Sequence, residues 1–195
     1  MLDLSKYLAK SNGITLKQHI EDLKNQLNVL LTHYPNLLTE EEKWLLELAI
    51  EYHDYGKVNK LFQEKLRNKK DDKIPHHLLS GLFLIKDALS KKLTDEQLEV
   101  VIYSIIRHHK RDKGYLNSIN RFKTELINSF DSFFDFDSSE LKKTINAYMW
   151  YFRKCANKIT NSNQLFQGEG KIEFTRKLIK VSGLLIRIDH SASGD

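Results

Sequence analysis

Helical periodicity runs through the whole chain, and this pattern limits the folds that are open to it. Apolar residues recur at three- and four-residue spacing, as Leu16, Ile20, Leu23, Leu27 and Leu30 show. No run of roughly four to eight residues alternates apolar and polar side chains as a half-buried strand would. We therefore expect an all-α fold.

Helix starts and chain breaks divide this pattern into segments. Three pairs have the spacing of a capping box, in which two side chains satisfy free backbone N–H groups at a helix start: Thr15 with Gln18, Thr39 with Glu42, and Thr94 with Gln97. Both prolines, Pro35 and Pro75, stand at apparent breaks. Gly56 follows the helical pattern of 44–52 and is expected to stop that helix.

These signals predict a single compact helical bundle, with about seven helices in one domain over residues 1–195. The expected helices are 16–30, 44–52, 76–90, 95–109, 121–132, 139–158 and 172–190. The expected loops are 110–120, 131–139 and 161–170.

Charge and hydropathy limit the kinds of partner that the chain is expected to have. It carries 31 Lys and Arg against 26 Asp and Glu, a formal charge of +5, which permits a nucleic-acid partner without requiring one. No apolar stretch approaches the roughly 18 residues of a membrane span. The first ten residues lack the basic start and apolar core of a secretory signal. We expect a cytoplasmic protein with no membrane partner.

Cysteine usage narrows the metal chemistry. Cys155 is the only cysteine, so it can neither form an internal disulfide nor supply a cysteine-rich zinc site. Histidine and carboxylate remain as metal ligands, and the chain holds eight histidines.

Residues that can bind metal recur on the apolar faces or at the ends of five expected helices. They are His19, His53 with Asp54, His76 with His77, His108 with His109, and Asp189. Taken alone, each of these residues can have a purely structural role, because a His-Asp pair can cap a helix and a core histidine can hydrogen-bond to a backbone carbonyl. Asp189 beside a buried stripe would still need a cation or hydrogen-bond donors.

As a set, these residues resemble the HD superfamily of metal-dependent phosphohydrolases, and in particular the HD nuclease domain of the type I CRISPR interference helicase-nuclease. The resemblance spans about residue 15 to the C-terminus and implies that the single compact helical bundle is of the HD-domain type. It is carried by the segments Leu16–His19, His53–Lys57, Pro75–Gly81, Ile106–His109 and Arg187–Ser193.

The resemblance implies two metal sites that share one carboxylate. His19, His53, Asp54 and Asp189 would hold one ion, and Asp54 would bridge to a second ion held by the following histidines: His76, His108 and His109. His76 is preferred over His77 by its spacing from Ser80, and the choice stays open. Asp54 and Lys57 are the implied catalytic residues, with Lys57 near the phosphate.

Two divalent ions can activate a water and stabilise both oxygens of an in-line phosphodiester displacement. A set rich in imidazole favours transition metals, namely Mn, Fe, Co, Ni or Zn, over Mg²⁺, which prefers oxygen ligands.

A basic stretch adjoins the histidine pair. Its candidate nucleic-acid contacts are Arg107, Lys110, Arg111, Lys113 and Tyr115. Cations that follow a phosphate backbone and an aromatic face for stacking are typical of single-strand binding. A solvated basic loop is the alternative.

We therefore expect a metal-dependent nuclease that hydrolyses single-stranded DNA in CRISPR antiviral defence. Its expected partners are a helicase domain or subunit and the RNA-guided surveillance complex, because the chain has no Gly-rich phosphate loop and is expected to continue in a larger protein or partner. Two alternatives stay open: an HD phosphohydrolase on a dNTP or cyclic dinucleotide, and a non-catalytic helical nucleic-acid-binding module.

Overall fold

The computed structural model describes residues 2–68, 75–109, 118–160 and 171–193, and within them the chain is helical with no named strand. The short elements are the 3-10 helices η1 (Leu4–Lys6) and η2 (Tyr55–Val58). The longer elements are α1 (Leu16–His33), α2 (Glu40–Tyr52), α3 (Lys60–Asn68), α4 (His76–Lys91), α5 (Asp95–Arg107), α7 (Ile119–Phe133), α8 (Ser139–Lys143), α9 (Ile145–Thr160) and α10 (Lys171–Ser193). The expected all-α class is confirmed.

The predicted helix starts are largely present. Thr39 with Glu42 and Thr94 with Gln97 form complete capping boxes before α2 and α5. Thr15 makes one half of the third box, since its side chain accepts a hydrogen bond from the Gln18 backbone N–H. These bonds satisfy donors that a helix start would otherwise leave unpaired.

One helix was not predicted, and two boundary predictions were wrong. The charge-rich segment Lys60–Asn68 forms α3, which buries Phe62 and Gln63 although most of its residues are polar. The helix expected over 139–158 is divided into α8 and α9 at Thr144, whose hydroxyl donates to the carbonyl of Leu141. α7 extends to Phe133, into the segment expected as a loop.

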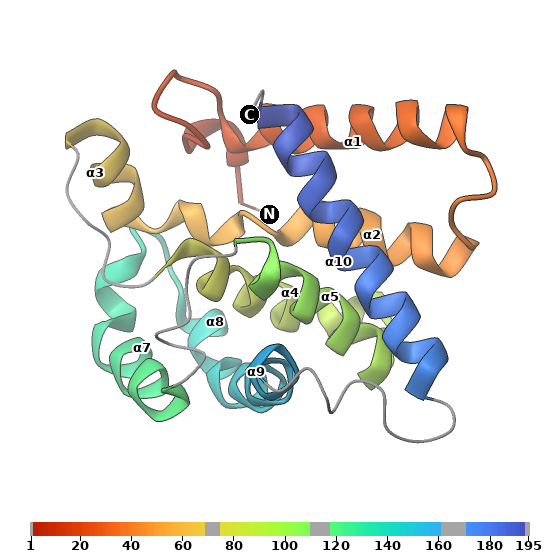
Figure 1. Cartoon of the computed structure of the whole chain (residues 1–195). Helices are drawn as coiled ribbons and strands as arrows, with labels where there is room; N and C mark the ends of the chain where they lie inside the picture. The colour runs from red at the N-terminus through yellow and green to blue at the C-terminus, as the bar shows by residue number, and fades with distance from the viewer. Residues whose placement is uncertain (1, 69–74, 110–117, 161–170, 194–195) are drawn as a thin grey trace.

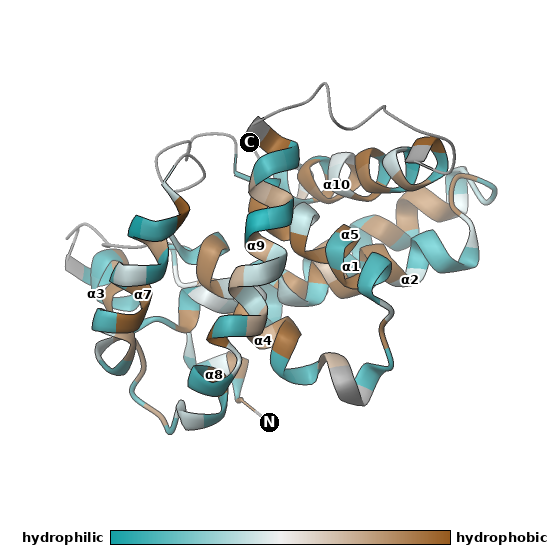
Figure 2. Ribbon diagram, turned by 90° about the horizontal axis from the view of Figure 1, so that it is seen from below, coloured by the Kyte–Doolittle hydropathy of each residue, from teal (hydrophilic) through white to brown (hydrophobic). Residues whose placement is uncertain are grey.

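α5 is the central helix of the bundle. Every residue from Leu98 to Ile106 is buried, which is typical of a helix that is covered on all sides. α10 packs against α5, α2 and α1, while α4 packs against η2, α5 and α9. Figure 1 shows the C-terminal end of α10 reaching the start of α1. Figure 2 shows hydrophilic and hydrophobic residues alternating along α10, as expected of a helix with one buried face.

Gly56 has a different role from the predicted one. α2 ends at Tyr52, and Gly56 lies in η2 without the positive φ of a helix-stopping glycine. Instead, a Cβ at this position would lie 1.9 Å from the carbonyl oxygen of His76. The Gly56 N–H donates to Ser80 Oγ at 2.8 Å, and Ser80 Oγ donates to the His76 carbonyl at 3.0 Å. Close backbone approach between η2 and α4 therefore requires glycine here.

The sequence predicts no membrane-spanning segment, and the helices of the structure can be compared with that prediction. Among the described residues, none forms a helix that is both long and apolar enough to cross a bilayer.

We predict opposite effects for two glycine-to-alanine changes. Gly56→Ala should lower the free energy of unfolding by about 1–3 kcal/mol or more, because the backbone of α4 has to move to admit the methyl group. Gly183→Ala, in the interior of α10 with no atom near its Cβ, should raise it by roughly 0.5–1 kcal/mol. Urea unfolding followed by circular dichroism measures both. Equal stability of Gly56→Ala and the wild type would contradict the close contact.

Candidate metal centre

The structure brings together all seven metal-ligand candidates, which come from five separate segments. His19 lies in the first turns of α1, His53 and Asp54 directly follow α2, His76 begins α4, His108 and His109 directly follow α5, and Asp189 lies near the end of α10. Each segment is fixed by the core helices described above, so the positions of the side chains depend on tertiary packing.

Asp54 lies at the centre of this cluster, and only 1% of its surface is exposed. Its Oδ2 atom lies 3.3 Å from His19 Nε2 and 3.4 Å from His53 Nε2. Its Oδ1 atom lies 3.2 Å from His76 Nε2 and 3.7 Å from His108 Nε2. The two oxygens of one carboxylate thus face two different sets of imidazoles.

The ligand atoms form two groups, each compact enough to surround an ion. The His76 group is Asp54, His76, His108 and His109, and the His19 group is His19, His53 and Asp189. Within each group, all ligand atoms lie within 4.8 Å of one another. Asp189 Oδ1 lies 3.2 Å from His19 Nε2 and 3.9 Å from His53 Nε2.

Two backbone carbonyls set the tautomers of the most buried rings. His53 Nδ1 lies 2.8 Å from the Ile50 carbonyl, and His108 Nδ1 lies 2.7 Å from the Ile105 carbonyl. A carbonyl can only accept, so Nδ1 carries the proton and, in a neutral ring, Nε2 has its lone pair directed at Asp54. A carbonyl on the far nitrogen is the usual support for a metal-binding histidine.

Several buried atoms of the cluster lack hydrogen-bond partners. They include Asp54 Oδ1, His53 Nε2 and His108 Nε2. Leaving such groups unpaired costs roughly 1–3 kcal/mol each, and more for a charged group. Lone pairs that converge without donors are what a cation would satisfy, so these residues fit a divalent metal ion.

The ionisation of the cluster agrees with this chemistry. Burial raises the pKa of Asp54, but the neighbouring His53 and Lys57 outweigh that effect and hold this pKa well below its usual range. Burial also lowers the pKa of His76 to about 4. At pH 7 the centre therefore offers an ionised carboxylate and a neutral imidazole, which are the forms that bind metal.

The structure distinguishes His76 from His77 by the groups that each ring contacts. His76 Nε2 lies next to Asp54 and 3.0 Å from His109 Nε2. His77 is buried and belongs to neither group, and its ring packs near His108 and His109. The structure thus brings His76, the preferred residue, to the carboxylate.

Lys57 lies inside the cluster, with its Nζ 2.6 Å from Asp54 Oδ2. The same Nζ donates to the Ala9 carbonyl at 3.3 Å. Gln63, in α3, donates to the carbonyls of Lys57 and Leu8 and accepts from the Leu8 N–H. Sequence reasoning missed Ala9 and Gln63, since a backbone carbonyl and a lone glutamine have no recognisable motif.

Of the five predicted nucleic-acid contacts, only Arg107 lies within the described residues. Arg107 is exposed at the end of α5 and donates to Tyr103 Oη at 2.8 Å. Lys110, Arg111, Lys113 and Tyr115 lie outside the described residues.

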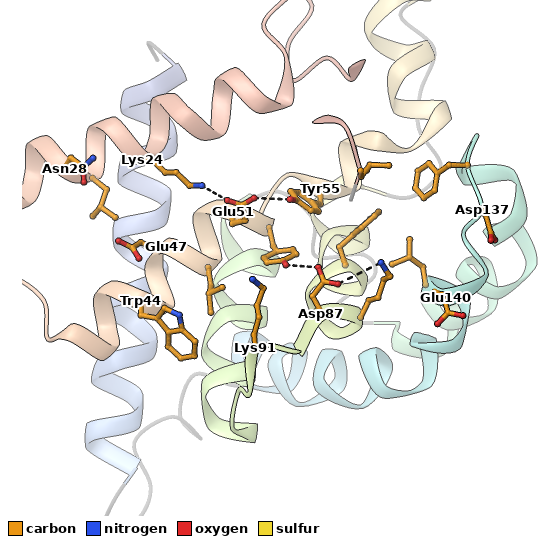
Figure 3. A pocket seen from close by; sticks show the side chains of 18 residues that line it. Lys24, Asn28, Trp44, Glu47, Glu51, Tyr55, Asp87, Lys91, Asp137 and Glu140 are labelled. Atoms are coloured by element: carbon orange, nitrogen blue, oxygen red, sulfur yellow. Dashed lines mark hydrogen bonds and ion pairs between the residues drawn. The ribbon is translucent and has the colours of Figure 1, made fainter. Parts of the chain in front are cut away.

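A separate cavity of about 1040 Å³ lies between α1, α2, α4 and α8. Figure 3 shows its lining, where Glu51 links Lys24 to Tyr55. None of the seven ligand candidates lines it. The metal centre and this cavity are therefore distinct places in the fold.

Comparison with protein families, with curated proteins and with solved structures finds no match to this chain. The case for a metal centre therefore depends on the geometry of the residues themselves.

We predict that divalent metal stabilises the folded protein. At an Mn²⁺ concentration about 100 times the Kd, binding adds roughly 2.7 kcal/mol, which raises the Tm of a chain of this size by about 5–10 °C. His108→Gln should lose most of this shift, because its Nε2 faces Asp54. His33→Gln, on the exposed end of α1, should keep it. Thermal unfolding of chelator-treated protein with and without Mn²⁺ measures the difference. An equal shift in both variants would exclude His108 as a ligand.

Proposed function

We propose that this protein is a divalent-metal-dependent phosphohydrolase that cleaves phosphodiester bonds in single-stranded DNA. The observation that carries the proposal is the placement of Asp54, whose two oxygens face two separate histidine-rich groups. One carboxylate shared between two ligand groups would hold two ions close together, as two-metal hydrolysis requires.

The seven clustered residues would hold two divalent ions, which would supply an activated water and stabilise charge on the phosphate oxygens. The ligand set, with its five imidazoles, supports Mn, Fe, Co, Ni or Zn rather than Mg²⁺.

The chain's own groups have definite tasks in this scheme. The Ile50 and Ile105 carbonyls hold the rings of His53 and His108 with Nε2 facing Asp54. Lys57 provides a positive charge at the edge of the centre, where it can stabilise a phosphate oxygen. The partly exposed His76 and Asp189 and the exposed His109 mark the side from which a substrate enters.

Single-stranded DNA is favoured as the substrate by three features. The chain has a formal charge of +5, Arg107 is exposed directly before His108, and the ligand set resembles the HD nuclease domain of CRISPR interference. By the same resemblance, we propose a helicase domain or subunit and the RNA-guided surveillance complex as partners. A dNTP or cyclic dinucleotide is the competing substrate class.

We expect chelator-treated protein to leave circular single-stranded DNA intact and Mn²⁺ to restore its cleavage. Asp54→Asn keeps the shape of the side chain but removes the shared charge, so the cleavage rate should fall by at least about 100-fold, on the order of losing a metal-activated nucleophile. Gel analysis of the DNA measures the rate. Asp131→Asn, an exposed residue of α7, is the matched control and should cleave like the wild type.

The same preparations should be assayed on a panel of dNTPs and cyclic dinucleotides. If the protein hydrolyses these compounds in the presence of metal but leaves the DNA intact, its substrate is a small nucleotide and not single-stranded DNA. Full activity in Asp54→Asn would refute the two-metal mechanism.

A further inference from the structure

The two oxygens of Asp54 differ in their surroundings, and this inference, which rests on the proposed function, starts from that difference. Oδ1, which faces His76 and His108, makes no hydrogen bond. Oδ2, which faces His19 and His53, is 2.6 Å from the Lys57 ammonium. One side of the carboxylate thus lacks a cation, while the other already has one.

The ammonium is held in place by the N-terminal segment, residues 2–15. Besides Asp54, its partner is the carbonyl of Ala9, a residue that is only 3% exposed. Gln63 fixes that segment from the other side, because its amide donates to the Leu8 carbonyl at 3.0 Å and to the Lys57 carbonyl at 2.7 Å. The Lys57 side chain is 11% exposed, so little solvent screens its charge.

A cation that approaches Oδ2 therefore meets a positive charge, whereas one that approaches Oδ1 meets an unpaired oxygen. Unit charges a few ångströms apart interact appreciably even near water, and more strongly where burial lowers the effective dielectric constant. Binding on the Oδ2 side requires the ammonium to move away or to be tolerated at a cost in affinity.

We propose that Lys57 is an internal counter-cation for the His19 group, and that it makes the two groups bind metal in sequence. The His76 group binds its ion first and more tightly. The His19 group binds second and more weakly, because its ion displaces the Lys57 ammonium from Asp54 Oδ2. Lys57 is in this respect a positioning residue that sets the order of metal binding.

The test is calorimetric titration of chelator-treated protein with Mn²⁺, which needs no substrate. Wild type should show two steps of unequal affinity. Lys57→Met should strengthen the weaker step on the order of tenfold and change the stronger step less, since the repelling charge is gone. Lys60→Met removes the same charge from the exposed first residue of α3 and should reproduce the wild-type titration.

Two further variants separate the loss of the Lys57 charge from any effect of the substitution on folding. Lys57→Gln retains hydrogen-bonding capacity toward Ala9 and Asp54 without the charge, so it should behave like Lys57→Met. Lys57→Arg retains the charge and should keep the weaker step weak. Circular dichroism of each variant establishes that it is folded before titration.

Three results would overturn the inference. Unchanged or weaker second-step binding in both neutral variants would show that Lys57 does not oppose the second ion. Two equal steps in the wild type would show that there is no order to explain. If the wild type binds no Mn²⁺ at all, the proposed function is refuted as well. The first two results, in contrast, would overturn only the role of Lys57 and leave the metal centre in place.

Discussion

Asp54 buries an ionised carboxylate at the point where α2 ends, and the surrounding structure compensates the cost of that charge. Desolvating an unpaired carboxylate costs several kcal/mol, so the fold has to supply positive charge or donors around it. Lys57 supplies a positive charge from one side, and imidazoles surround the rest. Because these partners come from α1, α4 and α5 as well as α2, the carboxylate links most of the bundle to one point.

Backbone contacts give the cluster its precision. The Ser80 hydroxyl accepts from the Gly56 N–H and donates to the His76 carbonyl, so hydrogen bonds through one side chain hold the segment after α2, with Asp54, against the start of α4, with His76. The carbonyls of Ile50 and Ile105 orient two of the rings in the same manner. Rigid support of this kind keeps ligands in position before any ion arrives, which reduces the ordering cost of binding.

The helices could be predicted from sequence because they depend on short-range patterns, whereas the grouping of the distant ligand candidates into one cluster was implied by the resemblance of the whole set to a known family. Apolar spacing and capping residues mark most helices, and unusual residues on apolar faces pointed to His19, His108 and Asp189. Other features depend on tertiary contacts that have no local signal. Gly56 is required by a carbonyl on another helix, and Ala9 acts through its backbone. α3 has too polar a sequence to predict that its Gln63 binds the Lys57 carbonyl, and the break at Thr144 depends on local hydrogen bonds from its N–H and its hydroxyl to the Leu141 carbonyl.

The contact between His19 and Asp189 joins the first long helix to the last, at 3.2 Å. Synthesis proceeds from the N-terminus, so a growing chain holds every histidine of both groups well before it holds Asp189. The His76 group can be assembled from α2, α4 and α5 at that stage, but the His19 group is complete only after α10 has been made and has packed against α1 and α5. The full set of ligands is therefore available only after α10 has been made, and a chain that ends before Asp189 lacks one of them.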